Sequence, residues 1–392
     1  MVELGWLWLS AMESSVLLRH SQRLIVNPDV SSQHALTNIF AMLPVKAEKA
    51  AEPPPVQLHE ARRFRVDTER EAFLQHLEEE GYAVVADVLS EQDIGHARSL
   101  LWDFLEALPQ TRVRRDDVKS WGCKRDWLPD ERNGILNGFG FGQSDFMWFL
   151  RLRPKVKDAF AAVWSTNDLL VSFDGGNVFR PWRFDPAWRT LGGWYHCDQN
   201  TRLGAASRGR CCVQGLVTLS EASRNSGGLV VVPQSHRDHA EVCERSALAR
   251  GGDFVPISVN DPILEKGPVL VAAKAGDLIL WDSRTVHCNT PGWAPEAEGM
   301  PFTQCAQMEE WQLLREVGYV CMTPAAWASD ETLEQLRKAF EEGISTSHWP
   351  HKFAIAGYPL PGMPPNDPQS ISQEQRRLIG YDRPRTWPCR VQ

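Results

Sequence analysis

The hydrophobic and polar positions divide the chain into a β-rich middle and helical flanks. Between residues 169 and 322 lie seven short runs of mainly apolar residues, rich in β-branched and aromatic side chains and separated by Gly, Pro, Asn and Asp. Such runs are typical of strands, and their irregular spacing favours an antiparallel sandwich or barrel over βαβ units. The runs are LLVSF, GGWYHC, CCVQGLVTLS, GLVVVP, PVLVAA, DLILWD and EVGYVCM.

Helical patterns lie on both sides of this region. Apolar residues recur there at the three- and four-residue spacing of a helix with one buried face. Ser90 and Asp93 have the spacing of a cap at a helix N-terminus. The expected helices cover residues 68–80, 90–108, 155–164, 330–343 and 370–379, with a short strand over 82–88. The helices are therefore expected to pack outside a β core.

The same patterns predict how the chain is divided. Residues 44–55 are rich in Pro, Ala and charge, have no apolar period, and indicate a linker. We expect residues 1–55 to form an N-terminal extension with this linker, 56–325 the main domain, and 326–392 a C-terminal helical extension. Residues 291–310 are rich in Pro, Gly and acidic side chains and predict a loop inserted into the main domain.

Composition and charge exclude several classes of partner. The 392 residues are 43% hydrophobic, and no apolar run reaches the length of about 18 residues that a membrane span requires. A net charge of −8 gives no basic footprint for nucleic acid or for an anionic membrane surface. We therefore expect a small-molecule substrate as the partner; the oligomeric state is left open.

Cysteine usage bears on the compartment. The nine cysteines are odd in number, contain no C-x-x-C pair and fall largely in predicted core strands. This pattern predicts reduced thiols and an intracellular, cytoplasmic location. Organelle targeting by an amphipathic N-terminal extension is left as an alternative.

The candidate chemistry begins at the tripeptide His196-Cys197-Asp198. Residues i and i+2 of a strand project from the same face, so an imidazole and a carboxylate would lie side by side. The best candidate for a third ligand is His287, which follows the predicted strand 277–282. Two histidines and one carboxylate leave open positions on iron(II), whereas zinc prefers a tetrahedral site. Because an H-x-D tripeptide is common by chance, the surrounding features decide its meaning.

Those features occur in a distinctive order. A strand-rich run over residues 213–232 contains an Asn-Ser-Gly-Gly turn, and Pro233-Gln234-Ser235-His236 follows it. Gly276-Asp277 then opens the strand that leads to His287, and the segment GYAVVADVLSEQDIGHARSLL precedes the whole series. Over roughly residues 70–325 this series resembles the phytanoyl-CoA dioxygenase family of iron(II)- and 2-oxoglutarate-dependent oxygenases.

The resemblance implies a fold and an activity. The fold would be mainly β, with a double-stranded β-helix core of the jelly-roll, cupin-like type and flanking α-helices. His196, Asp198 and His287 would hold Fe(II), and 2-oxoglutarate and O2 would be co-substrates. The enzyme would hydroxylate or otherwise oxidise a small organic or acyl substrate, with release of succinate and CO2. An Asp at position 198 favours hydroxylation over halogenation, because related halogenases are expected to have a small residue there.

The resemblance also implies an arginine that binds the distal carboxylate of 2-oxoglutarate. In the family this arginine lies at the start of the strand that follows the distal histidine. Here the predicted insertion delays that strand, which begins at Arg315. We therefore prefer Arg315 to Arg284 for this role, and expect Gln214 and Asn289 to be further contacts of the co-substrate.

The substrate is less closely defined. Several of the 16 tryptophans cluster near the predicted site, where they would serve core packing or line an apolar pocket. The residues proposed to contact the substrate are Arg180, Trp194 and Arg284. Two other functions are left open: a cupin-like metal-dependent hydrolase or isomerase, and a non-catalytic ligand-binding barrel.

Overall fold

The computed structural model describes residues 55–204, 207–247, 252–293 and 311–383. The predicted extension and linker, residues 1–55, therefore lie almost wholly outside the described residues, as does most of the predicted insertion, 291–310. The helices are α3 (Arg70–Glu80), α4 (Glu91–Leu105), α5 (Asp145–Arg151), α6 (Pro154–Trp164), α7 (His239–Arg245), α9 (Asp330–Glu341) and α10 (Gln373–Ile379).

The strands form two large sheets and a small one. The strands are β1 (Gln57–His59), β2 (Arg63–Phe64), β3 (Tyr82–Val85), β4 (Ile135–Leu136), β5 (Leu169–Val171), β6 (Gly176–Phe179), β7 (His196–Cys197), β8 (Val213–Thr218), β9 (Gly227–Val231), β10 (Val255–Pro256), β11 (Val269–Val271), β12 (Leu278–Asp282), β13 (His287–Pro291), β14 (Arg315–Pro324), β15 (Ser345–Thr346) and β16 (Ile355–Gly357).

The six-stranded sheet has the order β1-β11-β9-β13-β7-β10. The eight-stranded sheet has the order β2-β3-β12-β8-β14-β6-β4, with β5 paired to β14. All pairs in these two sheets are antiparallel except β1 with β11 and β2 with β3. The predicted β core of the jelly-roll type is confirmed, and in the described part of the chain neither sheet closes into a barrel.

The two sheets pack face to face through alternate residues of their strands. On β12, Ile279 and Trp281 lie in a buried apolar cluster that also contains Leu229 and Val231 of β9. Their neighbour Leu280 faces the other way, into the cluster shared with the helices. This two-residue period is the ordinary geometry of a strand. It decides which side chains can meet between the sheets.

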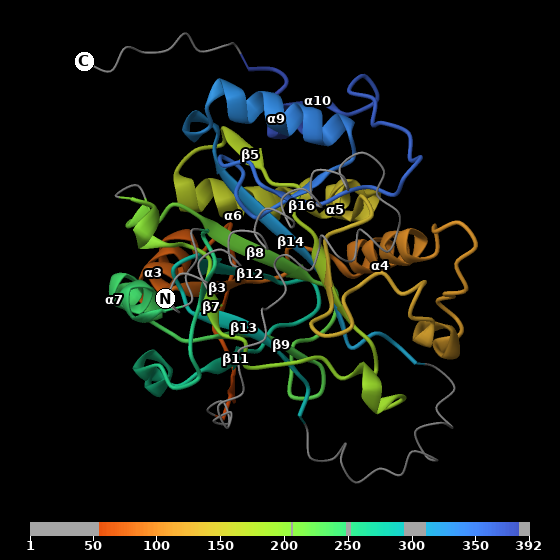
Figure 1. Ribbon diagram of the computed structural model, residues 1–392. Coiled ribbons are helices and arrows are strands. Elements are labelled where there is room, and N and C mark those ends of the chain that lie inside the picture. The colour runs from red at the N-terminus through yellow and green to blue at the C-terminus, as the bar shows by residue number, and fades with distance from the viewer. Residues whose placement is uncertain (1–54, 205–206, 248–251, 294–310, 384–392) are drawn as a thin grey trace, which may run out of the picture.

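Helices cover the outer faces of both sheets; those that flank the β region pack outside it, as the sequence predicted, whereas α7 was not predicted. In Figure 1, α5, α6, α9 and α10 lie on the side of the eight-stranded sheet that faces away from β9, β11 and β13. Their apolar side chains form one core cluster with the outer face of that sheet. Helix α7 packs through Val242 and Cys243 against the outer face of the six-stranded sheet.

Local sequence explains where several helices begin and end. The predicted cap of α4 is present as a capping box, in which Ser90 and Asp93 each accept from the other's backbone N–H. Helix α3 ends at Gly81, whose φ is +82°. A Cβ at Gly81 would lie 2.5 Å from Nδ1 of His236. Only glycine therefore allows the end of α3 to approach the turn that contains His236.

The C-terminal segment shares its core with the main sheet. Leu336 and Phe340 of α9 and Ile379 of α10 belong to the same buried cluster as α5 and α6. The hydroxyl of Ser345 accepts from the backbone N–H of Gly142 at 3.0 Å, which joins β15 to the turn before α5. The segment is therefore an integral part of the packed structure.

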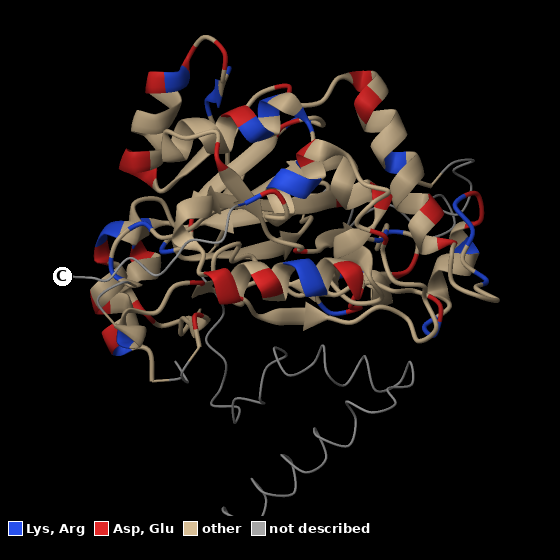
Figure 2. Ribbon diagram, turned by 90° about the horizontal axis from the view of Figure 1, so that it is seen from above, with Lys and Arg blue, Asp and Glu red and all other residues tan. Residues whose placement is uncertain are grey.

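Charged side chains lie mainly on the helices and loops, with acidic and basic residues intermixed, while the strands carry few (Figure 2). Of the helices that the structure describes, none combines the length and the apolar character needed to cross a bilayer.

A half-buried histidine in the C-terminal segment is expected to make the stability of the fold dependent on pH. His351 contacts Trp327 and Trp349, and its Nδ1 lies 3.1 Å from Oγ1 of Thr323. Burial, with the nearby Lys352, lowers the pKa of His351 from 6.5 to about 4. Between these two values the unfolded chain binds a proton that the folded chain does not, so stability falls as pH falls.

We predict that the free energy of unfolding decreases as the pH is lowered from 6.5 to 5, and that His351 contributes roughly 1–2 kcal/mol to this decrease. Denaturant unfolding of the wild type and of His351→Gln at several pH values measures the difference in slope. Equal slopes in the two proteins would contradict the assignment.

Candidate metal centre

The three predicted metal ligands converge between the two sheets. His196 on β7 lies directly opposite His287 on β13, and their ring centroids are 4.2 Å apart. Asp198 follows β7, and its backbone N–H donates to the carbonyl of Ser283 at 2.9 Å. Its Oδ2 lies 3.7 Å from Nε2 of His196 and 3.3 Å from Nε2 of His287. Two imidazoles and one carboxylate therefore face a common point, with 5% of each histidine exposed.

Backbone carbonyls fix the orientation of both imidazoles. Nδ1 of His196 lies 3.1 Å from the carbonyl oxygen of Trp194, and Nδ1 of His287 lies 2.9 Å from that of Thr285. A carbonyl oxygen only accepts, so each Nδ1 carries the proton and each Nε2 directs its lone pair to the point that the Asp198 carboxylate also faces. This is the arrangement that a metal-binding histidine requires.

The electrostatics of the centre favour the protonation state that binds a cation. Burial, followed by the neighbouring His287, lowers the pKa of His196 to about 4. Burial would raise the pKa of Asp198, but His196 and His287 hold it well below its ordinary value. Asp198 forms no ion pair with any Lys or Arg of the described residues, so its charge is free to stabilise a metal ion.

Gln214 holds the carboxylate in place. It lies on β8 and projects into the same interior as Leu216, and its Nε2 donates to Oδ2 of Asp198 at 2.8 Å. The sequence predicted Gln214 as a contact of the co-substrate, whereas the contact seen in the structure is with the metal-binding carboxylate. A neutral donor at this position orients the carboxylate without cancelling its charge.

Arg315 lies at the start of β14, buried to 2% exposure between the sheets. Its Nε donates to Oδ1 of Asn177 at 3.1 Å, and its Nη2 donates to Oδ1 of Asn289 at 3.2 Å. No acidic side chain of the described residues forms an ion pair with it. Burial lowers the pKa of Arg315, and nearby Tyr319 opposes that shift. A Cβ at Gly228 would lie 3.1 Å from Nη1, so glycine leaves room for the guanidinium.

The residues predicted to contact the substrate have different surroundings. Nε and Nη2 of Arg284 donate to the two carboxylate oxygens of Asp282, at 2.9 and 2.8 Å. This pair of donors is therefore already used and is not free to bind a substrate. The guanidinium of Arg180 lies over the rings of Trp127 and Trp188, and it donates to a backbone carbonyl. Only Trp194 meets the centre directly: its ring stacks on that of His196 with centroids 5.0 Å apart.

Two residues near the centre were not predicted from the sequence. The ring of Phe254 stacks on His196 at 4.7 Å, yet Phe254 is 40% exposed. His348, from the C-terminal segment, is among the groups that lower the pKa of Asp198, after His196 and His287. Its Nε2 is buried and has no hydrogen-bond partner among the described residues. The sequence does contain two nearby histidines, in His348-Trp349-Pro350-His351. They belong to no predicted strand, so nothing in the sequence places His348 near the metal ligands.

The fold and the centre together define a jelly-roll protein with a candidate site of two histidines and one carboxylate. The model of the phytanoyl-CoA dioxygenase family (PhyH) matches residues 77–290, more than half of the chain. The chain belongs to this family, which confirms the resemblance drawn from the sequence.

Relatives and solved structures with similarity to the chain are diverse. Ava biosynthesis cluster protein O of Aspergillus versicolor is 29% identical over 269 residues, which are 60% of this chain and 72% of the relative. The non-heme alpha ketoglutarate dependent carbocyclase SnoK from nogalamycin biosynthesis is 15% identical, with a TM-score of 0.43 over 67% of this chain and 88% of its own. EctD from S. alaskensis, solved with 2-oxoglutarate and 5-hydroxyectoine, is 14% identical, with a TM-score of 0.43 over 73% of this chain and 87% of its own. The family assignment comes from the family model and not from these distant structures.

We predict that Gln214→Leu weakens metal binding, because it removes the hydrogen bond that orients Asp198. The expected loss of Fe(II) affinity is about 10- to 100-fold, the range found when partners of metal ligands are removed. Anaerobic Fe(II) titration of the two proteins measures it. Gln143→Leu, a change of the same type at a half-buried glutamine outside the centre, is the control. An unchanged affinity in Gln214→Leu would show that Asp198 needs no such support.

Proposed function

We propose that this protein is an Fe(II)- and 2-oxoglutarate-dependent dioxygenase that hydroxylates or otherwise oxidises a small organic or acyl substrate. The observation that carries the proposal is the buried guanidinium of Arg315, which has no acidic counter-ion among the described residues and lies on the same interior face as the three candidate ligands. A buried charge without a counter-ion is costly, so its presence predicts an anionic ligand.

The spacing of this cation from the centre suits a short dicarboxylate. Arg315 is hydrogen-bonded to Asn289, which lies two residues after His287 on β13. Residues i and i+2 of a strand share a face and are about 7 Å apart. A five-carbon 2-oxo dicarboxylate can reach from a metal at His287 to a cation at this distance.

The surroundings of Arg315 prepare it for that role. A planar guanidinium binds a carboxylate through two parallel hydrogen bonds, and Asn177 and Asn289 hold the fork in one orientation. Tyr319 adds a hydroxyl 3.5 Å from Nδ2 of Asn289, and burial raises the pKa of this phenol. Tyr319 therefore stays protonated and can donate to the same carboxylate.

The candidate ligands fit iron. Both Nε2 lone pairs and the Asp198 carboxylate lie on one side of the point they face, which leaves the other side for exogenous ligands. When bound, iron(II) supplies the redox chemistry that couples the decarboxylation of 2-oxoglutarate, with release of succinate and CO2, to the oxidation of a substrate by O2. The protein orients the metal-binding side chains, excludes water from the centre and positions the substrate.

The residues beside His196 suit a substrate with apolar and polar parts. The exposed ring of Phe254, together with Trp194, offers an aromatic surface next to the centre. Nε2 of His348 offers a hydrogen-bonding atom that no described residue uses. We propose that an apolar part of the substrate contacts Phe254 and that a polar group binds His348.

The proposal predicts a specific spectroscopic and chemical result. Anaerobic addition of Fe(II) and then 2-oxoglutarate to the metal-free protein should produce a metal-to-ligand charge-transfer band in the visible range. Admission of O2 should then yield succinate. Asp198→Ala should lose both signals, because it removes the only carboxylate of the centre, while Asp367→Ala, which changes an exposed acid, should keep them.

Absence of both signals in folded protein that still binds Fe(II) would reject the 2-oxoglutarate assignment. The alternatives would then be a cupin-like hydrolase or isomerase, or a ligand-binding barrel.

Arg315 provides a second, separate test. Arg315→Leu should weaken 2-oxoglutarate binding by at least about tenfold, because truncating one partner of a buried charge pair costs about 2–5 kcal/mol. Arg315→Lys should retain part of the affinity, since it keeps the charge but loses the planar fork. Fe(II) binding without 2-oxoglutarate is the internal control and should be unchanged. Equal 2-oxoglutarate affinity in all three proteins would remove Arg315 from the site.

A further inference from the structure

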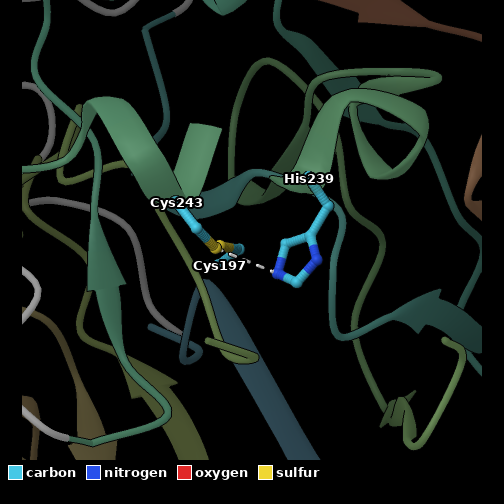
Figure 3. Close-up of side chains that lie close together, drawn as sticks. All are labelled: Cys197, His239 and Cys243. Atoms are coloured by element: carbon cyan, nitrogen blue, oxygen red, sulfur yellow. Dashed lines mark hydrogen bonds between the residues drawn. The ribbon is translucent and has the colours of Figure 1, made fainter. Parts of the chain in front are cut away.

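A second group of metal-ligating side chains lies on the opposite side of β7. It consists of Cys197, His239 and Cys243, whose donor atoms all lie within 4.8 Å of one another. Figure 3 shows the two sulfurs side by side, with the imidazole of His239 turned toward them. All three residues are buried, at 0%, 3% and 0% exposure. This group, which we call the outer cluster, has no part in the proposed oxygenase chemistry.

The fold brings the outer cluster together in two ways. Because strand residues alternate, Cys197 points away from His196 and into the apolar cluster on the outer face of the sheet. His239 and Cys243 stand four residues apart on α7, so they share one face of that helix. Helix α7 packs on the sheet through that face, which places both residues over Cys197.

The donor atoms converge on the carbonyl oxygen of Gln199. This oxygen lies 3.6 Å from the sulfur of Cys197, 3.6 Å from that of Cys243 and 2.5 Å from Nε2 of His239. The sulfur of Cys243 lies 3.3 Å from Nε2. With metal–sulfur and metal–nitrogen bonds of about 2.3 and 2.0 Å, a tetrahedral zinc site has edges of roughly 3.3–3.8 Å. Of these four distances, only that from His239 to Gln199 is shorter than such an edge. There Nε2–H donates to the carbonyl, so metal binding would move this proton to Nδ1 and lengthen the contact.

We propose that Cys197, His239 and Cys243 bind a thiophilic divalent cation of the zinc type, with the Gln199 carbonyl or a water molecule as fourth ligand. Thiolate and imidazole are the donors that such ions prefer, whereas the centre on the inner face offers only nitrogen and oxygen. Two thiolates and one neutral imidazole balance a charge of +2. A neutral complex suits the apolar surroundings of the outer cluster.

The two thiols of the outer cluster differ in acidity before a metal binds. Hydrogen bonds with Cys197 and then with His239 outweigh burial and hold the pKa of Cys243 well below its ordinary value, whereas the hydrogen bond with Cys243 and then burial raise the pKa of Cys197. A thiolate is the form in which cysteine ligates a metal. Metal binding would therefore have to displace the proton of Cys197. The bound ion would tie α7 to β7, the strand that carries His196 and leads into Asp198, so the outer site would stabilise the position of the inner one.

Cobalt(II) titration of the metal-free full-length protein tests the proposal. Co(II) bound by cysteine gives a thiolate-to-metal charge-transfer band in the near ultraviolet, and Co(II) at His196, Asp198 and His287 gives none, since no thiolate is present there. The band should appear in the wild type and in Asp198→Ala, and should be displaced by Zn(II). It should be strongly reduced in Cys243→Ser and in His239→Gln.

Cys212→Ser is the matched control, because it removes a buried thiol elsewhere and should leave the band unchanged. Lack of a thiolate band in the folded, fully reduced wild type would overturn the proposal, as would a band that persists unchanged in Cys243→Ser. A spontaneous Cys197–Cys243 disulfide that prevents loading would also overturn it. If Cys243→Ser fails to fold, the wild-type titration and His239→Gln decide the result.

Discussion

The structure depends on the alternation of side chains along strands that lie between two packed sheets. A strand residue faces either the neighbouring sheet or the outer layer, and its successor faces the other way. On β7 this rule sends His196 inward and Cys197 outward, and it returns Asp198 to the interior. The same rule applies on β13, where His287 and Asn289 face inward and Cys288 packs outward. A shift of one residue in either strand would exchange the metal ligands for core side chains.

Burial of polar groups between the sheets imposes the second constraint. The polar groups of the candidate site have partners of suitable chemistry: backbone carbonyls accept from the histidine Nδ1 atoms, Gln214 donates to Asp198, and two asparagines accept from Arg315. These partners orient the side chains, but they leave the carboxylate and the guanidinium without counter-ions in the described residues. The residual charges are opposite in sign and lie on the same interior face. The interior is therefore prepared for a cation and an anion at neighbouring positions, which is the pair that a metal and a 2-oxo dicarboxylate provide.

The C-terminal segment connects the stability of the fold with the candidate site. Its helices complete the apolar core over the eight-stranded sheet, and β15 is hydrogen-bonded to the loop before α5. The same segment brings His348 close enough to act on the charge of Asp198. Residues 345–351 are not part of either sheet that carries the metal ligands. Substitutions in this segment can therefore alter the surroundings of the centre without moving the ligands themselves.

The sequence by itself determined the local features. It indicated five of the seven described helices and many of the strands, the cap at Ser90, the pair His196 and Asp198 on one strand face, and the family, because each depends on short-range periodicity or on the order of motifs. Only the tertiary structure decided which distant residues meet. It placed Gln214 on Asp198, joined Arg315 to Asn177 and Asn289, and gathered Cys197, His239 and Cys243 behind the centre. Such contacts arise from strand register and from helix packing between segments far apart in the chain, and no local pattern encodes them.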